Sequence, residues 1–353
     1  MNPGSAISRT DFDHVLNHTS ELWKDLRGAR LFITGGSGFV GKWLVETLLA
    51  ADERHRLGLR VTVLTRDSVG FRARLHWIAA APAVTVVQGD VRSFAFPDGA
   101  FSHVIHAAGD LAVNAAPLYV HDVIVAGTRR VLEFAAGRGI ADMLLVSSGA
   151  AYGRQPDDVE RLDEDFAGAP SLTEPRTAYG QGKREAEWLS HAHAAAHGIR
   201  LRVVRPFTLV GPYLPLDGDF AVSNFVADLM AGRPIGVAGD GTALRTYLYA
   251  ADMAIWLWAA LLRGPPGLVC NVGGEEVVSM AELATLIAGL ARPALRVRIA
   301  HAAPPARAAQ RYVPSVARAR QVLGVAPTVL LEDGLRRMIT SYELAAAGRR
   351  ILA

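Results

Sequence analysis

The stretch LFITGGSGFVGKWLVETLL, residues 31 to 49, decides the fold predicted for this chain. Its apolar start is typical of a buried strand and its later part has helical spacing, with glycines three residues apart at Gly35, Gly38 and Gly41. Such glycines permit a tight turn and close approach of the backbone to a pyrophosphate, which the helix N-terminus also favours. A glycine-rich turn without a ligand is the alternative. The residues expected to line the phosphates are Gly35, Ser37, Gly38, Phe39, Val40 and Gly41.

Short apolar runs alternate with helical patterns along the first two thirds of the chain. Strands are expected at 30–34, 60–65, 84–89, 103–108, 143–148 and 201–207, and helices at 39–51, about 70–80, 117–138 and 179–196. This alternation predicts parallel strands with crossover helices, which make a doubly wound α/β sheet.

The two ends of the chain have different patterns from this central part. Residues 11–26 have mostly helical spacing, and after Phe207 the sequence loosens into loops rich in glycine and proline, with helices near 219–231, 251–263, 279–291 and 330–345. We expect a helical extension at 1–28, a dinucleotide-binding domain at 29–207 and a smaller α/β region at 208–353. That last region is expected to bind mainly the substrate and to return some segments to the first domain.

Composition excludes several classes of protein. Half of the 353 residues are hydrophobic, the net charge is only +3, and the arginines are spread among acids, which argues against nucleic acid and permits an anionic small molecule. The single cysteine, Cys270, excludes an internal disulfide and a four-cysteine metal site, and no metal is expected. The N-terminus has no signal-like apolar core, and the most apolar run, 253–262, is too short to span a bilayer. We expect a cytoplasmic protein with no membrane partner.

A lysine stands out because only three of the 37 basic residues are lysines. Lys183 lies four residues after Tyr179, which puts both side chains on one face of a helix. An ammonium beside a phenol favours the phenolate, so that the tyrosine can exchange a proton with a substrate hydroxyl or carbonyl. The alternative is an exposed Tyr–Lys pair on an amphipathic helix.

The strand at 60–65 should end at the residue that contacts the adenosine ribose. Thr65 stands where a protein that prefers NAD would place an acid, and Arg66 follows it. An arginine can grip a 2′-phosphate, so NADP is the expected cofactor, with NAD as the alternative. In that alternative Asp67 turns inward, or Arg66 is an ordinary surface arginine.

An ordered set of motifs runs through the chain. It comprises TGGSGFVG (34–41), GDV (89–91), HAAG (106–109), SSGAAYG (147–153), Tyr179-xxx-Lys183, RPFTLVGP (205–212), GDGTALRTYLYAADMA (239–254), NVGG (271–274) and RYVPS (311–315). The set resembles the extended short-chain dehydrogenase/reductase family, in its nucleotide-sugar epimerase/dehydratase branch. The resemblance implies a Rossmann-type fold, a nicotinamide cofactor, a nucleotide-diphosphate sugar as substrate, and a homodimer.

The resemblance also implies roles for particular residues. Catalysis would fall to Ser148, Tyr179 and Lys183, with Ser148 chosen over Ser147 by its distance from Gly153. The cofactor would be contacted by Asp90, Val91, Ala107, Ala108, Gly109, Tyr179, Lys183 and Pro206, and the substrate by Ser148, Thr208, Arg245 and Arg311. Two positions depart from the family pattern, because Ile124 and Thr208 stand where asparagines are usual.

The residues after Ser148 limit the reaction. Dehydratases of the family typically carry an Asp–Glu pair there and decarboxylases a glutamate nearby, whereas this chain has Gly149 and Ala150. We expect hydride transfer at C4 of a nucleotide-linked hexose, by a 4-epimerase or a 4-keto reductase. Three alternatives stay open: a 4,6-dehydratase that takes its acid from another loop, for example Asp110; a non-catalytic NADP-sensing protein; and a reductase of steroids or flavonoids.

Overall fold

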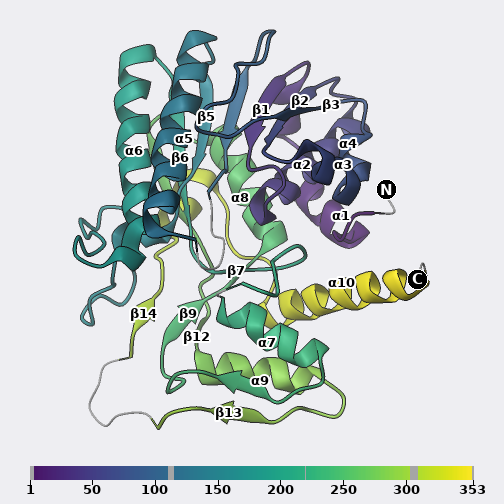
Figure 1. Cartoon of the computed structure of the whole chain (residues 1–353), viewed down its shortest axis with the longest axis vertical. Helices are drawn as coiled ribbons and strands as arrows, with labels where there is room; N and C mark the ends of the chain where they lie inside the picture. Colours follow the sequence, from purple (N-terminus) through teal and green to yellow (C-terminus); the bar gives the residue numbers. More distant parts are fainter. Residues whose placement is uncertain (1–3, 110–114, 219, 303–308, 352–353) are drawn as a thin grey trace.

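The computed structural model describes residues 4–109, 115–218, 220–302 and 309–351. Its centre is a seven-stranded parallel sheet in the order β11-β6-β5-β4-β1-β2-β3 (Figure 1). The strands are β1 (Arg30–Thr34), β2 (Arg60–Thr65), β3 (Val84–Gln88), β4 (His103–His106), β5 (Asp142–Val146), β6 (Arg200–Pro206) and β11 (Leu268–Val272). The predicted Rossmann-type, doubly wound fold is confirmed.

Helices cover both faces of the sheet because each strand is apolar on both sides. On one face lie α5 (Pro117–Gly137) and α6 (Ala178–His197), and on the other α2 (Phe39–His55) and α8 (Ala250–Arg263) (Figure 1). Successive side chains of β1 alternate between the two cores, since Leu31 and Ile33 join the cluster around α2 and α8 while Phe32 packs 4.6 Å from Phe134 of α5, between ring centroids. The alternation fixes the strand between two layers of helices.

A smaller region lies below the carboxyl ends of these strands (Figure 1). Its helices are α7 (Ala221–Met230), α9 (Met280–Leu290) and α10 (Leu331–Ile351), and a π-helical turn at Ala319–Leu323 precedes α10. Its strands are β7 (Leu209–Val210) with β10 (Leu248–Tyr249), β8 (Ile235–Val237) with β13 (Val297–Ile299), and β9 (Leu244–Thr246) between β12 (Val277–Ser279) and β14 (Arg311–Tyr312). Short pairings between distant segments therefore build this region.

Two predicted helices are each divided. The helix expected at 11–26 becomes α1 (Arg9–His18) and a 3₁₀ turn at Trp23–Leu26, because the hydroxyl of Thr19 bonds back to the carbonyl of Val15 where α1 ends. The helix expected near 70–80 becomes α3 (Ser68–Arg74) and α4 (His76–Ala79), since the buried Leu75 between them has non-helical dihedrals, φ −126° and ψ 42°.

The sequence patterns did not predict β11. Its residues lie within the stretch after Phe207 in which loops were expected, and their pairing with β6, for example Val269 beside Val203, makes them the seventh strand. The chain thus returns to the large sheet after building part of the smaller region. Within the described part of the chain, no helix combines the length and apolar character needed to cross a membrane.

Candidate active site

A pocket of about 230 Å³ opens at the carboxyl ends of β1, β2 and β4, where the strand order reverses direction. Open α/β sheets bind their ligands at such a switch point. The residues of this pocket that the sequence predicted are Gly35, Ser37, Gly38, Thr65, Arg66, Asp90, Val91, Ala107, Ala108 and Gly109.

The glycine loop fits the phosphates of a dinucleotide. Gly35 has φ +74°, and a Cβ there would lie 2.5 Å from the backbone of Ala107. A Cβ on Gly41 would lie 2.1 Å from the carbonyl oxygen of Gly35. Gly38 caps α2, so the N–H groups of Phe39 and Val40 in its first turn have no partner within the helix and can meet an anion.

A buried histidine supports the opposite wall of the pocket. The hydroxyl of Thr128 donates to the carbonyl of Ile124, so it accepts from Nε2–H of His106 at 3.0 Å. Nδ1 of His106 then accepts from Thr34, 2.6 Å away, whose oxygen accepts from the N–H of Ala108. Burial lowers the pKa of His106 to about 3, which keeps the ring neutral. His106 is the first residue of the HAAG motif, and the motif alone predicts no role for it.

The side chains expected at the adenosine end of the pocket, those of Thr65, Arg66 and Asp67, point in different directions. Thr65 is buried at the end of β2, while Nη1 of Arg66 donates to the hydroxyl of Tyr119 at 2.8 Å. The carboxylate of Asp67 caps α3 by accepting from the N–H of Gly70 at 2.7 Å, and this hydrogen bond lowers its pKa. Asp67 does not line the pocket, whereas Thr65 and Arg66 do.

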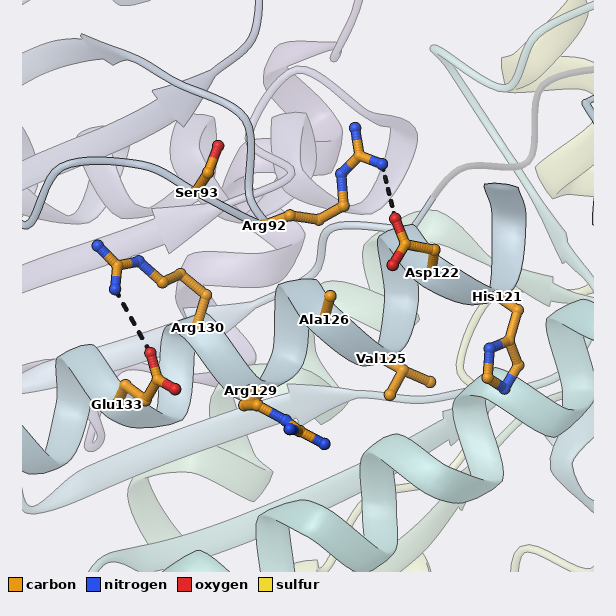
Figure 2. Close-up of a pocket in the computed structure, with 9 residues that line it drawn as sticks. All are labelled: Arg92, Ser93, His121, Asp122, Val125, Ala126, Arg129, Arg130 and Glu133. Carbon is orange, nitrogen blue, oxygen red and sulfur yellow. Dashed lines mark hydrogen bonds and ion pairs between the residues drawn. The ribbon is translucent and has the colours of Figure 1, made fainter. Parts of the chain in front are cut away.

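Asp90 faces the pocket while its carboxylate is held from behind by Arg92, with hydrogen bonds of 2.8 to 2.9 Å that lower its pKa to about 2. Arg92 also lines a wider hollow of about 610 Å³ along α5 (Figure 2). There Arg92 pairs with Asp122, and Arg130 with Glu133. These charges neutralise one another, and none of the predicted catalytic or glycine-loop residues lines the hollow.

The three predicted catalytic side chains come together. Lys183 Nζ is buried, lies 5.7 Å from the centroid of the Tyr179 ring and donates to the carbonyl of Val146 at 2.8 Å. Ser148 follows β5 and interacts with the phenol of Tyr179. A Cβ on Gly109 would lie 3.4 Å from Lys183 Nζ, so the cofactor pocket adjoins this cluster.

The ionisation of the Tyr–Lys pair differs from the expectation. Burial raises the pKa of Tyr179 to about 12, with the Ser148 hydroxyl acting in the opposite direction, and burial lowers the pKa of Lys183 to about 8, opposed by Glu187. The expected fall in the pKa of the phenol is therefore not seen, because desolvation is the largest influence on the phenol, while the Nζ of Lys183 donates to Val146. The phenol is protonated at rest.

Ser147 and Ser148 have separate partners. The hydroxyl of Ser147 donates to the carboxylate of Glu187. Ser148 Oγ instead accepts from the N–H of Ala150 at 3.1 Å and interacts with the phenols of Tyr179 and Tyr312. This placement agrees with the choice of Ser148 as the hydroxyl next to the reacting oxygen. Glu187 was not singled out from the sequence.

Tyr312 of β14 adds a hydroxyl that the sequence analysis missed. Tyr312 is partly buried, and burial of its phenol raises its pKa; the phenol interacts with Ser148 and Tyr179. Its ring packs 4.5 Å from that of Phe207, between centroids. A Cβ on Gly149 would lie 2.5 Å from the Tyr312 hydroxyl and 2.7 Å from the Phe207 ring. The only signal was its place in RYVPS, which does not reveal what β14 faces.

Only one of the two predicted substrate arginines shares the face of Tyr312. Arg245 lies beside Tyr312 in register, its guanidinium carbon 5.8 Å from the ring centroid, and Nη1 donates to the carbonyl of Leu244 at 2.8 Å. Burial lowers the pKa of Arg245. Arg311 precedes Tyr312 on β14, so its side chain leaves the strand on the opposite face.

The remaining predicted positions lie around the same strand ends. Pro206 closes β6, and the carbonyl of Thr208 accepts from the N–H of Leu248 at 3.0 Å. Ile124 packs against Gly182 of α6, so an apolar contact stands where the family usually has an amide. Asp110, the acid suspected for dehydration, lies outside the described residues.

A dinucleotide crevice beside a tyrosine, a buried lysine and a serine defines a nicotinamide-dependent oxidoreductase of the extended short-chain type. A sequence model described as the NAD dependent epimerase/dehydratase family matches residues 31–273. The chain therefore belongs to the NAD-dependent epimerase/dehydratase family and is an enzyme of that family, which confirms the resemblance seen in its motifs.

Individual proteins resemble the chain over most of its length. UDP-glucuronic acid decarboxylase 6 of Arabidopsis thaliana is 28% identical over 316 residues, which are 89% of this chain and 89% of that protein. The structure of Epimerase Mth375 from Methanothermobacter thermautotrophicus has a TM-score of 0.78 at 23% identity and covers 96% of this chain and 98% of its own. The structure of UDP-glucuronic acid 4-epimerase from Bacillus cereus, in complex with UDP-glucuronic acid and NAD, has a TM-score of 0.75 at 19% identity. The match covers 90% of this chain and 99% of that one.

Proposed function

We propose that this enzyme transfers hydride at C4 of a nucleotide-linked hexose or of its 4-keto derivative, as a 4-epimerase or a 4-keto reductase. When bound, the nicotinamide accepts or returns the hydride at C4. Tyr179 takes the O4 proton when the hydroxyl becomes a carbonyl and gives it back in the reverse direction. Ser148 orients O4, and Lys183 supplies positive charge next to the phenol. The resting phenol is protonated, which suits proton donation to a carbonyl.

One observation carries this choice of reaction. Elimination of water across C5 and C6 needs an acid for the leaving oxygen and a base for the C5 proton. The position after Ser148 is Gly149, and the space next to it is filled by the hydroxyl of Tyr312 and the ring of Phe207. An acid side chain has no room there, and Ala150 cannot carry a proton.

Arg245 supports a diphosphate as the anchor of the substrate. Its half-buried guanidinium lies beside Tyr312, and the partners described for it are backbone carbonyls and that ring. A charged group in such a place gains from a bound anion, and a guanidinium matches phosphate oxygens in pairs. Binding energy from the diphosphate would then hold C4 at Tyr179. A reductase of steroids or flavonoids would not need this arginine.

The test is to incubate the protein with UDP-, dTDP-, CDP- and GDP-hexoses and their 4-keto-6-deoxy derivatives, with and without NADPH, and to follow the products by NMR. A hexose inverted at C4, or a 4-keto group lost only with NADPH, supports the proposal. Accumulation of a 4-keto-6-deoxy sugar from an unmodified hexose contradicts it. No turnover of these sugars, and none of UDP-glucuronic acid either, favours the non-catalytic alternative.

A second candidate is oxidative decarboxylation of a UDP-linked uronic acid, which the names of the Arabidopsis relatives suggest. Oxidation at C4 makes the C6 carboxylate a β-keto acid, which can lose CO₂ without the acid–base pair that dehydration needs. The same triad would serve, although this chain lacks the glutamate that such enzymes usually carry near Ser148. Release of CO₂ from UDP-glucuronic acid separates this reaction from inversion at C4, which yields UDP-galacturonic acid.

NADP(H) is proposed as the preferred cofactor. Thr65 places no carboxylate at the ribose, Asp67 is occupied as the cap of α3, and Arg66 lines the pocket with its guanidinium held by Tyr119. Titration of both cofactors into stripped protein should show tighter binding of NADP(H). Arg66→Ala should cut that preference by about tenfold and leave NAD(H) affinity nearly unchanged. An unchanged ratio would exclude Arg66 as the phosphate contact, and tightly retained NAD would favour a 4-epimerase.

The enzyme is also proposed to form a homodimer. Its α5 and α6 lie side by side on the outside of the sheet (Figure 1). They expose the large apolar side chains of Leu118 and Trp188. Light scattering after gel filtration should give twice the mass of the chain, and Trp188→Glu should shift the protein toward monomer. A monomeric parent protein at working concentration would contradict this assignment.

A further inference from the structure

The catalytic lysine has no polar support from α5. On that helix Ile124 packs against Gly182, the residue before the lysine, and its side chain cannot form a hydrogen bond. On the strand side, Lys183 Nζ donates to the carbonyl of Val146 at 2.8 Å. The residues that fix this carbonyl and α6 relative to each other therefore determine where the ammonium stands.

Glu187 is placed to do this. It lies one helical turn after Lys183 on α6 and is 6% exposed. Its carboxylate accepts hydrogen bonds from the hydroxyl of Ser147, which directly follows Val146, and from Nε and Nη2 of Arg205 at 3.0 and 2.6 Å. One side chain thus joins α6 to the ends of β5 and β6.

Arg205 completes the arrangement from β6. Its guanidinium lies 4.6 Å from the centroid of the Tyr152 ring, and Nη1 donates to the carbonyl of Glu164 at 3.3 Å. A buried ion pair contributes little net stability, because the cost of removing two charges from water offsets their attraction. The position of the pair beside Lys183 suggests a role in the active site.

We propose that Glu187, paired with Arg205, is the positioning residue for the catalytic lysine: it holds Lys183 against the Val146 carbonyl and keeps its ammonium charged inside the protein. The link to turnover rests on the proposed function, in which Lys183 assists Tyr179. The effect on Lys183 itself does not depend on which sugar is the substrate.

The charges around Lys183 determine the sign of the effect. Burial lowers the pKa of Lys183 to about 8, and the carboxylate of Glu187 opposes that fall. On its own helix the lysine lies beside the phenol of Tyr179, and the neutral His106 at the end of β4 faces it from the sheet. Arg205 of β6 pairs with Glu187, which offsets its charge. Removing the charge of Glu187 takes away a favourable neighbour and leaves Arg205 unpaired. Both changes lower the pKa of Lys183.

Because lysine is rare in this chain, the pKa of Lys183 can be measured directly by NMR. The chain has three lysines, Lys24, Lys42 and Lys183, so the intact protein labelled with ¹³Cε-lysine gives three signals to titrate, two of which are internal references. Glu187→Gln should lower the pKa of Lys183 by about one unit. The matched control is Glu185→Gln on the same helix, a partly exposed residue paired with His121, which should leave the Lys183 signal unchanged.

A second variant, expected to shift the pKa of Lys183 in the opposite direction, distinguishes a charge effect from misfolding. Arg205→Gln leaves the carboxylate of Glu187 uncompensated and should raise the pKa of Lys183. A shift of the same sign in both variants, or no shift in Glu187→Gln, would overturn the proposal. Neither titration needs a substrate, so their outcome stands even where the proposed reaction is wrong.

Turnover gives the second readout. Glu187→Gln should lower kcat about tenfold while KM changes less than about threefold, and the alkaline limb of its rate profile should move to lower pH, because Lys183 loses its proton earlier. Glu187→Asp, which keeps the charge, should restore most of the alkaline limb. A loss of kcat that is uniform across pH, without a shift of the limb, would reduce Glu187 to a structural residue.

Discussion

The two sides of the active site are built in different ways. The cofactor side comes from one continuous loop, Gly35 to Gly41, and from strand ends of a single sheet, and its glycines lie so close to neighbouring backbone that a Cβ would overlap it. The substrate side comes from β9, β12 and β14, three short strands from distant parts of the chain. From this difference we propose that hydride transfer depends on the rigid sheet, whereas the later segments that meet at Ser148 select the reaction.

The largest effect is expected where the two sides meet. Tyr179→Phe removes the proton carrier, and kcat should fall by about a thousandfold or more while cofactor affinity stays near normal. The kinetics are measured together with a cofactor titration, which serves as the control for folding. A kcat close to that of the parent would remove Tyr179 from the mechanism. Lys183→Arg should also be severely impaired, because a guanidinium is bulkier and differently shaped.

The next effect tests the rigidity of the cofactor side. In Gly41→Ala the new Cβ would lie 2.1 Å from the Gly35 carbonyl oxygen, so we expect a loss of about 2 to 4 kcal/mol in unfolding free energy and far weaker cofactor binding. Denaturant unfolding and cofactor titration measure the two effects. The control is Gly289→Ala on α9. Its new Cβ would have no neighbouring atom within 4 Å, so the free energy of unfolding should rise by up to about 1 kcal/mol. Equal behaviour of the two variants would contradict the close packing of the loop.

A smaller effect is expected on the substrate side. Gly149→Ala pushes against Tyr312 and Phe207, and kcat should fall about tenfold with unchanged cofactor affinity. In a double-mutant cycle, Tyr312→Phe should cost less in the Gly149→Ala background than in the parent, since the contact with the Tyr312 hydroxyl is already disturbed. Additive effects would mean that Gly149 and Tyr312 act independently.

The smallest effect concerns pH and the Asp90–Arg92 pair. The pKa of Asp90 is lowered from 3.8 to about 2, so the pair contributes its stability above about pH 4 and loses it as the pH falls toward 2. Asp90→Asn should cost on the order of 1 to 2 kcal/mol at pH 7, and the difference from the parent should vanish near pH 2. Denaturant unfolding across this pH range checks it. A difference that stays constant down to pH 2 would show that the carboxylate charge is not the cause.

Signals contained in one local stretch could be predicted from the sequence. The glycine loop lies within one strand–helix junction, and the Tyr179–Lys183 pair lies within one helix. The residue spacing in each therefore predicts the local geometry. Whether Asp67 would turn inward stayed open, because only the cap that it forms on α3 decides its direction.

Features that depend on distant pairing could not be predicted. Tyr312 reaches Ser148 because β14 pairs with β9, whose residues precede it by more than sixty positions. The five residues of β11 become a strand only when β6 is beside them. The pKa of Tyr179 was expected to fall with a lysine nearby, and it rises because the depth of burial is a property of the whole fold.

The late return of β11 to the sheet has a consequence for how the chain is made. As the polypeptide leaves the ribosome, β6 emerges about sixty residues before its outer neighbour, and until then its backbone groups form an open edge. An open strand edge can recruit a strand from another molecule. A fragment that stops after Phe207 would keep this edge open, so we expect it to self-associate more readily than the full chain, in which the later segment carries the covering strand into place.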